Sequence, residues 1–163
     1  MNSGATTTTV STRELSLSRL IPAPPGMVYH AWVTRFAHWW GPHGMTTPAC
    51  EMDLRPGGIF RTIMRAPDGR EFRTKGVFLE VVPGKRIVFT DAFGPGWEPD
   101  ADIFFTAIIT FDEVPDGGTC CTARALHWNQ ADRDKHEHLG FHQGWGESLD
   151  RLAELIDQLP STP

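Results

Sequence analysis

The sequence of 163 residues contains few cysteines, and their positions exclude several kinds of site. Cys50, Cys120 and Cys121 form no C-x-x-C pair, which argues against a zinc site built on cysteine. A disulfide between Cys120 and Cys121 would be strained, because neighbouring strand residues point to opposite faces of a sheet. Unpaired thiols are typical of a reducing compartment, so we expect a cytoplasmic protein.

Positive charge and long apolar runs are also scarce. Fifteen Lys and Arg residues against twenty Asp and Glu residues give a formal net charge of −5. Because nucleic-acid binders concentrate positive charge, no nucleic-acid partner is expected. The sequence has no run of about 18 apolar residues, so we predict no membrane span and no membrane partner. Residues 1–12 lack the apolar segment of a secretory signal, and we expect a flexible tail before a single domain over residues 13–160.

Aromatic residues without a phenol group are abundant. Six Trp and ten Phe residues accompany a single Tyr, a balance that suits apolar packing or an apolar cavity. Hydrophobic residues make up 40% of the chain and charged residues 21%, which fits a globular protein rather than a disordered one. A chain of this length buries roughly 70% of its surface on folding, so it needs no disulfide or metal to complete a core.

Short alternating segments separated by Gly- and Pro-rich turns dominate the chain up to residue 128. The predicted strands are 13–21, 49–54, 59–65, 72–82, 86–91, 103–114 and 119–128, with short helices at 27–33 and 36–40. Hairpin-linked strands form antiparallel sheets, and a helix must then cover the apolar face. Gly76 would help such a sheet bend. We therefore predict an α+β fold in which a curved antiparallel sheet of about six to seven strands wraps around a long C-terminal helix, leaving a gap for a ligand.

The C-terminal segment changes to a helical period. Apolar or aromatic residues recur at alternating spacings of three and four at His142, Trp145, Leu149, Leu152, Ile156 and Leu159. This spacing predicts one continuous buried face on a long helix that Pro160 ends. Asn129 or Asp132 can cap the start of this helical segment.

Several motifs occur in an order that is specific for one family. They are WWGP at 39–42, DLRPGG at 53–58, MRAPDG at 64–69 and GFHQGW at 140–145. The chain resembles the START-like, helix-grip (SRPBCC) superfamily and, within it, the homologues of the activator of heat-shock protein 90 ATPase. This resemblance implies a helix-grip fold that holds small apolar molecules between sheet and helix. In a few relatives the cavity carries out cyclase or aromatase chemistry.

The candidate ligand-binding residues come from the loops, the inner strand faces and the helix. They are Trp39, Trp40, Phe60, Met64, Phe78, Trp97, Phe105, Arg124, Trp128, Phe141, His142 and Trp145. Loop tryptophans over a gap between sheet and helix would form its mouth; the alternative is plain packing of the short helices against the sheet. Met64 would add adaptability to the lining.

Polar candidates have two interpretations each. His142 either points into the cavity, where it could bind a ligand or move a proton, or is a satisfied core histidine. Arg124 shares a strand face with Trp128; if that face is inner, a buried carboxylate such as Glu80 must pair with the arginine, and otherwise the face is solvent-exposed.

A metal interpretation is weaker. His136, His138 and His142, with His127 as a further ligand, do not match the H-E-x-x-H pattern, so no metal ion and no other cofactor is expected.

The sequence thus predicts a binder of a small hydrophobic or aromatic molecule. One alternative is a cyclase- or hydrolase-type enzyme that uses His142, or Arg124 with Glu80, in the same cavity. A module that stimulates a chaperone ATPase is less favoured, because the eukaryotic co-chaperone carries an additional N-terminal domain that binds and activates the chaperone. No catalytic residue is assigned, and a homodimer remains open.

Overall fold

The computed structural model describes residues 12–159, which fold into a sheet covered on one face by helices. The strands of this sheet are β1 (Glu14–Ile21), β2 (Thr46–Met52), β3 (Ile59–Arg65), β4 (Glu71–Val82), β5 (Arg86–Thr90), β8 (Phe105–Glu113) and β9 (Thr119–His127). The helices are α1 (Pro25–Thr34), α2 (Phe36–Trp39), α3 (Gln130–His138) and α4 (Phe141–Gln158). The predicted α+β helix-grip fold is confirmed. The predicted tail over residues 1–12 and the stop at Pro160 concern positions that lie, apart from residue 12, outside the described residues.

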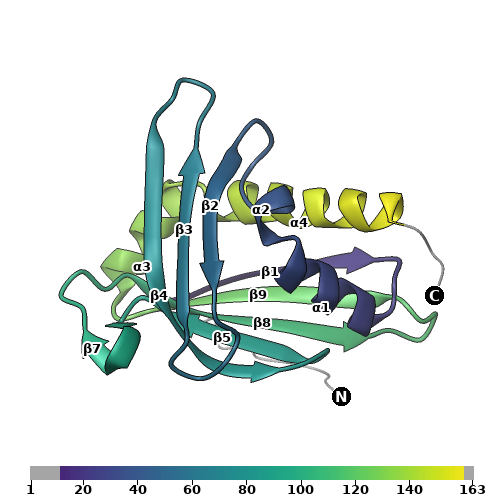
Figure 1. The fold of residues 1–163 in the computed structure, drawn as a ribbon, viewed down its shortest axis with the longest axis horizontal. Helices are drawn as coiled ribbons and strands as arrows, with labels where there is room; N and C mark the ends of the chain where they lie inside the picture. Colours follow the sequence, from purple (N-terminus) through teal and green to yellow (C-terminus); the bar gives the residue numbers. More distant parts are fainter. Residues whose placement is uncertain (1–11, 160–163) are drawn as a thin grey trace, which may run out of the picture.

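The sheet has seven strands in the order β1-β9-β8-β5-β4-β3-β2, and every neighbouring pair is antiparallel. In Figure 1, β2, β3 and β4 rise steeply across the direction of β1, β8 and β9, and α4 runs along the hollow side of the sheet. This curvature has a local cause at Gly76, where a Cβ atom would collide with the carbonyl oxygen of Thr90. A register shift between Phe78 and Glu80 adds a bulge next to it.

The DLRPGG segment makes the turn between β2 and β3. A Cβ atom at Gly58 would collide with the carbonyl oxygen of Asp53, so only glycine fits this turn. The turn is also fixed to β4: the Gly57 N–H donates to the Phe78 carbonyl at 2.7 Å, and the Phe78 N–H donates to the Gly58 carbonyl at 2.9 Å. The motif therefore anchors the inner face of β4 at Phe78.

Helix α4 fixes the loop that joins α2 to β2. Nη1 of Arg151 donates to the carbonyl oxygens of Trp40 at 3.0 Å, Gly41 at 2.8 Å and Pro42 at 3.2 Å. The Gly41 N–H donates to Oγ of Ser148 at 3.0 Å. One guanidinium thus donates to several carbonyl groups of this loop.

The C-terminal segment differs from its prediction. It forms two helices, because Gly140 adopts a left-handed conformation (φ +95°) and ends the first one. Asn129 caps α3 by accepting from the Asp132 N–H at 2.8 Å. At the start of α4 the buried residue is Phe141, and His142 is exposed. The predicted inward position of His142 is therefore wrong: the core turns towards α3 at this point, and Phe141 fills it.

The predicted loop after β5 contains short structure of its own. It holds the two-residue strands β6 (Phe93–Gly94) and β7 (Glu98–Pro99) around a 3-10 turn at Pro95–Trp97. Trp97 adopts a positive φ of 62°, an uncommon conformation for a bulky residue. Within the described residues, no helix is both long enough and apolar enough to cross a membrane.

Candidate functional site: an aromatic hollow between sheet and helices

Aromatic rings line the inner, concave side of the sheet where it bends. Phe60 stacks on Phe78 with their ring centres 5.0 Å apart, and Phe89 meets Phe60 edge-on at 4.7 Å. Strand alternation explains this grouping, because Phe60 pairs with Gly76 and Phe78 pairs with Phe89 across neighbouring strands. Gly76 also borders a gap beside these rings.

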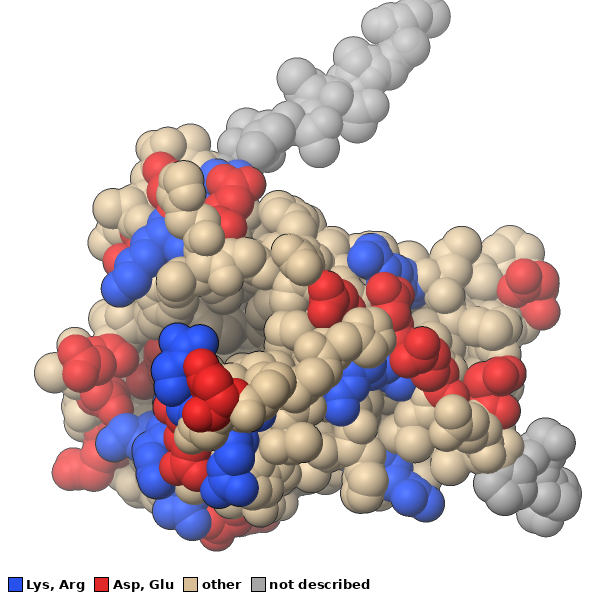
Figure 2. Space-filling model, turned by 90° about the horizontal axis from the view of Figure 1, so that it is seen from above, with Lys and Arg blue, Asp and Glu red and all other residues tan. Residues whose placement is uncertain are grey.

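This gap is a cavity of about 50 Å³, which we call the hollow. Its lining residues are Phe60, Thr74, Lys75, Gly76, Phe89, Thr90, Asp91 and Phe105. Figure 2 shows the molecule hollowed between the charged tip of the β3–β4 hairpin and the side on which α3 lies. The hairpin charges are paired with one another, as in Arg65 with Glu71 at 2.7 Å and Arg70 with Asp68 at 2.8 Å.

Rings from the helices pack near the hollow without lining it. Trp40, which follows α2, stacks on Phe36 at 5.0 Å and meets Trp145 of α4 edge-on at 5.0 Å. Trp145 in turn lies 6.4 Å from Phe105, a lining residue of the hollow. Ring contacts therefore connect sheet and helices without interruption.

Met64 sits where the α2–β2 loop crosses the sheet. A Cβ atom at Gly41 would lie 2.7 Å from Sδ of Met64, so the thioether packs directly against this glycine. Its cross-strand partner Phe72 is 42% exposed and forms the outer rim. Phe72 was missed at the sequence level, although its alternation with Thr74 and Gly76 places it on the inner face.

Polar groups at the hollow are few. Oδ1 and Oδ2 of Asp91 accept from the Phe104 N–H at 3.0 and 2.9 Å, which fixes the start of β8. Burial raises the pKa of the Asp91 carboxyl above its usual range, the hydrogen bonds opposing this shift. Hydroxyl groups of Thr62 and Thr74 bond each other across β3 and β4.

A pair of buried histidines lies beside the hollow under α3. Nε2 of His127 is 2.9 Å from Nδ1 of His136, and Nδ1 of His127 is 2.8 Å from the Arg13 carbonyl oxygen. The His136 ring lies 4.8 Å from the Phe105 ring and 5.1 Å from the Phe141 ring. Burial, and secondarily the charge that His127 can carry, lower the pKa of His136 to about 4.

Sequence reasoning considered these two histidines only as metal ligands. In the described part of the chain, no three His, Cys, Asp or Glu side chains are grouped to hold a metal ion. The alternation of β9 already placed His127 on the same face as Ala123 and Ala125, but it does not reveal the contact with His136.

Two of the predicted residues, Phe60 and Phe105, line the hollow. Trp145 contacts Phe105, Trp40 and Phe141 contact Trp145, and Met64 packs on Gly41. Trp39 and Phe78 are fully buried beneath the hollow, so Trp39 packs in the core rather than at a mouth.

Four predicted residues lie elsewhere. Trp97 is 49% exposed and packs on Gly57 and Phe93, beside a separate depression of about 490 Å³. Trp128 is 44% exposed and faces another depression with Leu126. Both were predicted at the cavity mouth, and the strand order places them away from it. His142, as described above, is exposed as well.

The predicted pairing of Arg124 with Glu80 is also wrong. Nε of Arg124 is 2.7 Å from Oε2 of Glu14 on the outer face, because β1 is the neighbour of β9. Glu80 pairs with Arg86 on that same face. The two residues are kept apart by β8 and β5, which lie between β9 and β4.

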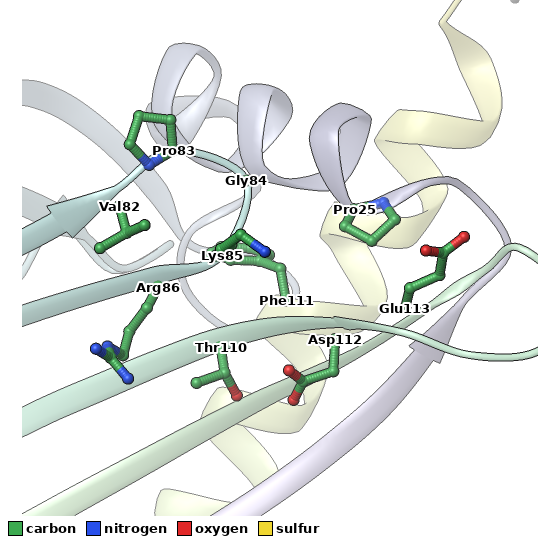
Figure 3. A pocket seen from close by; sticks show the side chains of 10 residues that line it. All are labelled: Pro25, Val82, Pro83, Gly84, Lys85, Arg86, Thr110, Phe111, Asp112 and Glu113. Carbon is green, nitrogen blue, oxygen red and sulfur yellow. The ribbon is translucent and has the colours of Figure 1, made fainter.

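A larger depression lies at the opposite end of the sheet. It has a volume of about 660 Å³, and its walls come from the β4–β5 turn, the end of β8 and the start of α1 (Figure 3). Lys85, Asp112 and Glu113 are exposed in this depression. Its aromatic lining residue, Phe111, is buried beneath it. Apolar ligands need ring-lined, enclosed surface, so we assign the candidate site to the smaller hollow.

The motifs and the fold can now be compared with known proteins. The profile of the family described as Activator of Hsp90 ATPase homolog 1-like protein matches residues 22–157. The chain belongs to this family. Among curated proteins, none matches the chain.

Solved structures similar to this Hsp90-activator-like chain come from several bacteria. A protein of Nitrosomonas europaea is 35% identical, with a TM-score of 0.86 over 91% of this chain and 96% of that one. A Chromobacterium violaceum protein is 28% identical, with a TM-score of 0.71 over 90% and 99% of the two chains. A Silicibacter pomeroyi protein that carries the family's name is 23% identical, with a TM-score of 0.65 over 88% and 97%, and supports the fold alone.

Proposed function

We propose that this protein binds a small hydrophobic or aromatic molecule in the hollow between the bent sheet and helices α2, α3 and α4. The observation that carries the proposal is the group of rings, Phe60, Phe89 and Phe105, that line one gap on the concave side of the sheet. Membership of a family whose superfamily holds apolar molecules between sheet and helix supports the same assignment.

The volume of the hollow limits how a ligand enters. A space of about 50 Å³ admits roughly one or two water-sized groups, whereas pockets for small organic ligands measure about 300–1,000 Å³. A ligand of one or two rings must therefore displace side chains. Met64 is the element best able to move, because its unbranched thioether side chain is flexible and only half-buried.

The test uses 2-methoxynaphthalene as a neutral apolar probe and isothermal titration calorimetry as the measurement. Thr74→Trp places a ring in the hollow from an exposed position on β4, so we expect it to weaken binding at least about tenfold. Arg73→Trp is the matched control: it adds the same ring one residue away, on the opposite face of the strand.

The control should bind the probe as the wild type does. Equal loss in both variants, or no binding of the probe to the wild type, would overturn the proposal. Native mass spectrometry of protein purified from its own source adds a second readout, since a retained molecule of defined mass would identify the natural ligand.

A further inference from the structure

We infer that the molecule bound in the hollow carries a hydroxyl or N–H group on its ring system, and that Nε2 of His136 accepts a hydrogen bond from this group. The inference rests on the proposed function and deepens it by naming the ligand class: neutral, ring-bearing hydrogen-bond donors such as phenols or indoles. It concerns a side chain that the family's motifs at 39–42, 53–58, 64–69 and 140–145 do not include.

Hydrogen-bond chemistry fixes which ring nitrogens carry protons when both histidines are neutral. A carbonyl oxygen only accepts, so Nδ1 of His127 must donate to Arg13 at 2.8 Å. Nε2 of His127 is then an acceptor, and Nδ1 of His136, 2.9 Å away, must donate to it. The proton of His136 is therefore on Nδ1, and its Nε2 presents a lone pair.

This lone pair has no protein partner among the described residues, although the His136 side chain is about nine-tenths buried. In the same part of the chain, Oγ1 of Thr47 is the one fully buried side-chain polar atom without a partner. Nε2 of His136 therefore keeps access to open space. Nε2 lies on the far side of the imidazole from the α3 backbone, in a shell of rings formed by Phe104, Phe105 and Phe141.

Phe105 links this nitrogen to the hollow. Its ring lines the hollow and lies 4.8 Å from the centre of the His136 ring. His136 does not itself line the hollow, so a ligand must displace the Phe105 ring to reach its Nε2. Because Nε2 has no protein partner among the described residues, a ligand donor would add a hydrogen bond without breaking one within the protein.

The chemistry of the His127–His136 pair also disfavours ligands that carry a carboxylate. The low pKa of His136 keeps its ring neutral near pH 7, so Nε2 offers no proton to a carboxylate. The cation that lines the hollow, Lys75, is already paired: its Nζ lies 3.7 Å from Oδ2 of Asp100. A carboxylate ligand would enter apolar surroundings without a hydrogen-bond donor from this histidine.

The experiment compares three probes of the same ring system: 2-naphthol, 2-methoxynaphthalene and 2-naphthoate. In calorimetry, the wild-type protein should bind 2-naphthol about five- to tenfold more tightly than 2-methoxynaphthalene. This difference corresponds to one net hydrogen bond. The acid should bind more weakly than either. In His136→Phe the preference for the hydroxyl should vanish, while 2-methoxynaphthalene still binds.

Because His136→Phe also removes the donor to His127, a second measurement uses the unaltered protein. In ¹⁵N-histidine-labelled protein, the Nε2 resonance of His136 should move from the position of a bare imidazole nitrogen towards that of a hydrogen-bonded one on addition of 2-naphthol. It should not do so with 2-methoxynaphthalene.

Equal binding of 2-naphthol and 2-methoxynaphthalene, with an unmoved Nε2 resonance, would overturn this inference and leave the proposed function standing. Failure of all three probes to bind would overturn both.

Discussion

The two ends of the space between sheet and helices are built from different side chains. At the end covered by α1 and the C-terminal part of α4, small and aliphatic residues such as Ala107, Ile109 and Leu152 are fully buried. At the end covered by α2, α3 and the start of α4, the rings of Phe60, Phe89 and Phe105 line the hollow, and Trp40 and Trp145 pack nearby. The difference shows that the excess of Trp and Phe over Tyr serves two purposes, of which core packing is only one.

The aliphatic end should provide most of the stability. Leu152→Ala opens a cavity at a site with 0% exposure, and we expect it to lower the free energy of unfolding by about 2–5 kcal/mol. Met64→Ala, at the half-buried aromatic end, should cost about 1 kcal/mol or less, because the site already adjoins open space. Urea denaturation of the two variants measures the contrast. Equal losses of unfolding free energy in the two variants would contradict the proposed difference between the aliphatic and the aromatic end.

The histidine pair should make the aromatic end sensitive to acid. The pKa of His136 is about 4 in the folded protein and near 6.5 in an unfolded chain. Between these values the unfolded state binds more protons than the folded state. The contribution of His136 to the free energy of unfolding is therefore fully present above about pH 6.5, and it falls by up to about 3 kcal/mol as the pH drops to about 4.

The check is the difference in unfolding free energy between wild type and His136→Phe, measured at pH 7, 5.5 and 4. Both proteins lose stability as their carboxylates are protonated, and this common part cancels. The wild type should lose more. Parallel curves for the two proteins would show that His136 titrates normally.

The loop between α2 and β2 joins the two ends, and Arg151 holds it. Arg151→Met removes the hydrogen bonds to the Trp40, Gly41 and Pro42 carbonyl groups, and we expect a loss of about 2 kcal/mol. Trp40 should also become more mobile, which hydrogen exchange of residues 40–45 would detect. Arg151→Lys keeps the charge but offers no planar fork, so it should recover only part of the loss.

Substitutions on the outer face of the sheet should have the smallest effect on stability. Arg124 and Glu14 form a partly exposed ion pair there, worth less than about 1 kcal/mol. A double-mutant cycle of Arg124→Gln and Glu14→Gln should return a coupling energy in this range, with unchanged binding of 2-methoxynaphthalene. A change in probe binding would place Arg124 in the ligand site after all.

Local patterns in the sequence predicted the elements well where a single strand decides the outcome. Strand β3 was predicted with its exact bounds, and the alternation of Phe105, Ala107, Ile109 and Phe111 on the inner face of β8 is confirmed. Gly76 was correctly associated with the bend, because close approach of two backbones needs a residue without a side chain.

Predictions failed where the partner comes from a distant part of the chain. The pairing of Arg124 requires the strand order, which places β1 rather than β4 beside β9. The position of His142 requires knowledge that Gly140 breaks the helix and that Phe141 fills the core towards α3. The contact between His127 and His136 joins a strand to a helix nine residues later, and periodicity within either element does not reveal it.

The most direct measurement uses methionine methyl groups as reporters of both ends. Met64 lies on β3, on the same face as Phe60, which lines the hollow, and Met27 of α1 lines a separate depression of about 290 Å³ at the aliphatic end. On addition of 2-methoxynaphthalene to methyl-labelled protein, the Met64 signal should shift through the ring current of the bound probe, while the Met27 signal stays in place. A shift of Met27 without a shift of Met64 would contradict the account, because the ligand would then occupy the other end of the molecule.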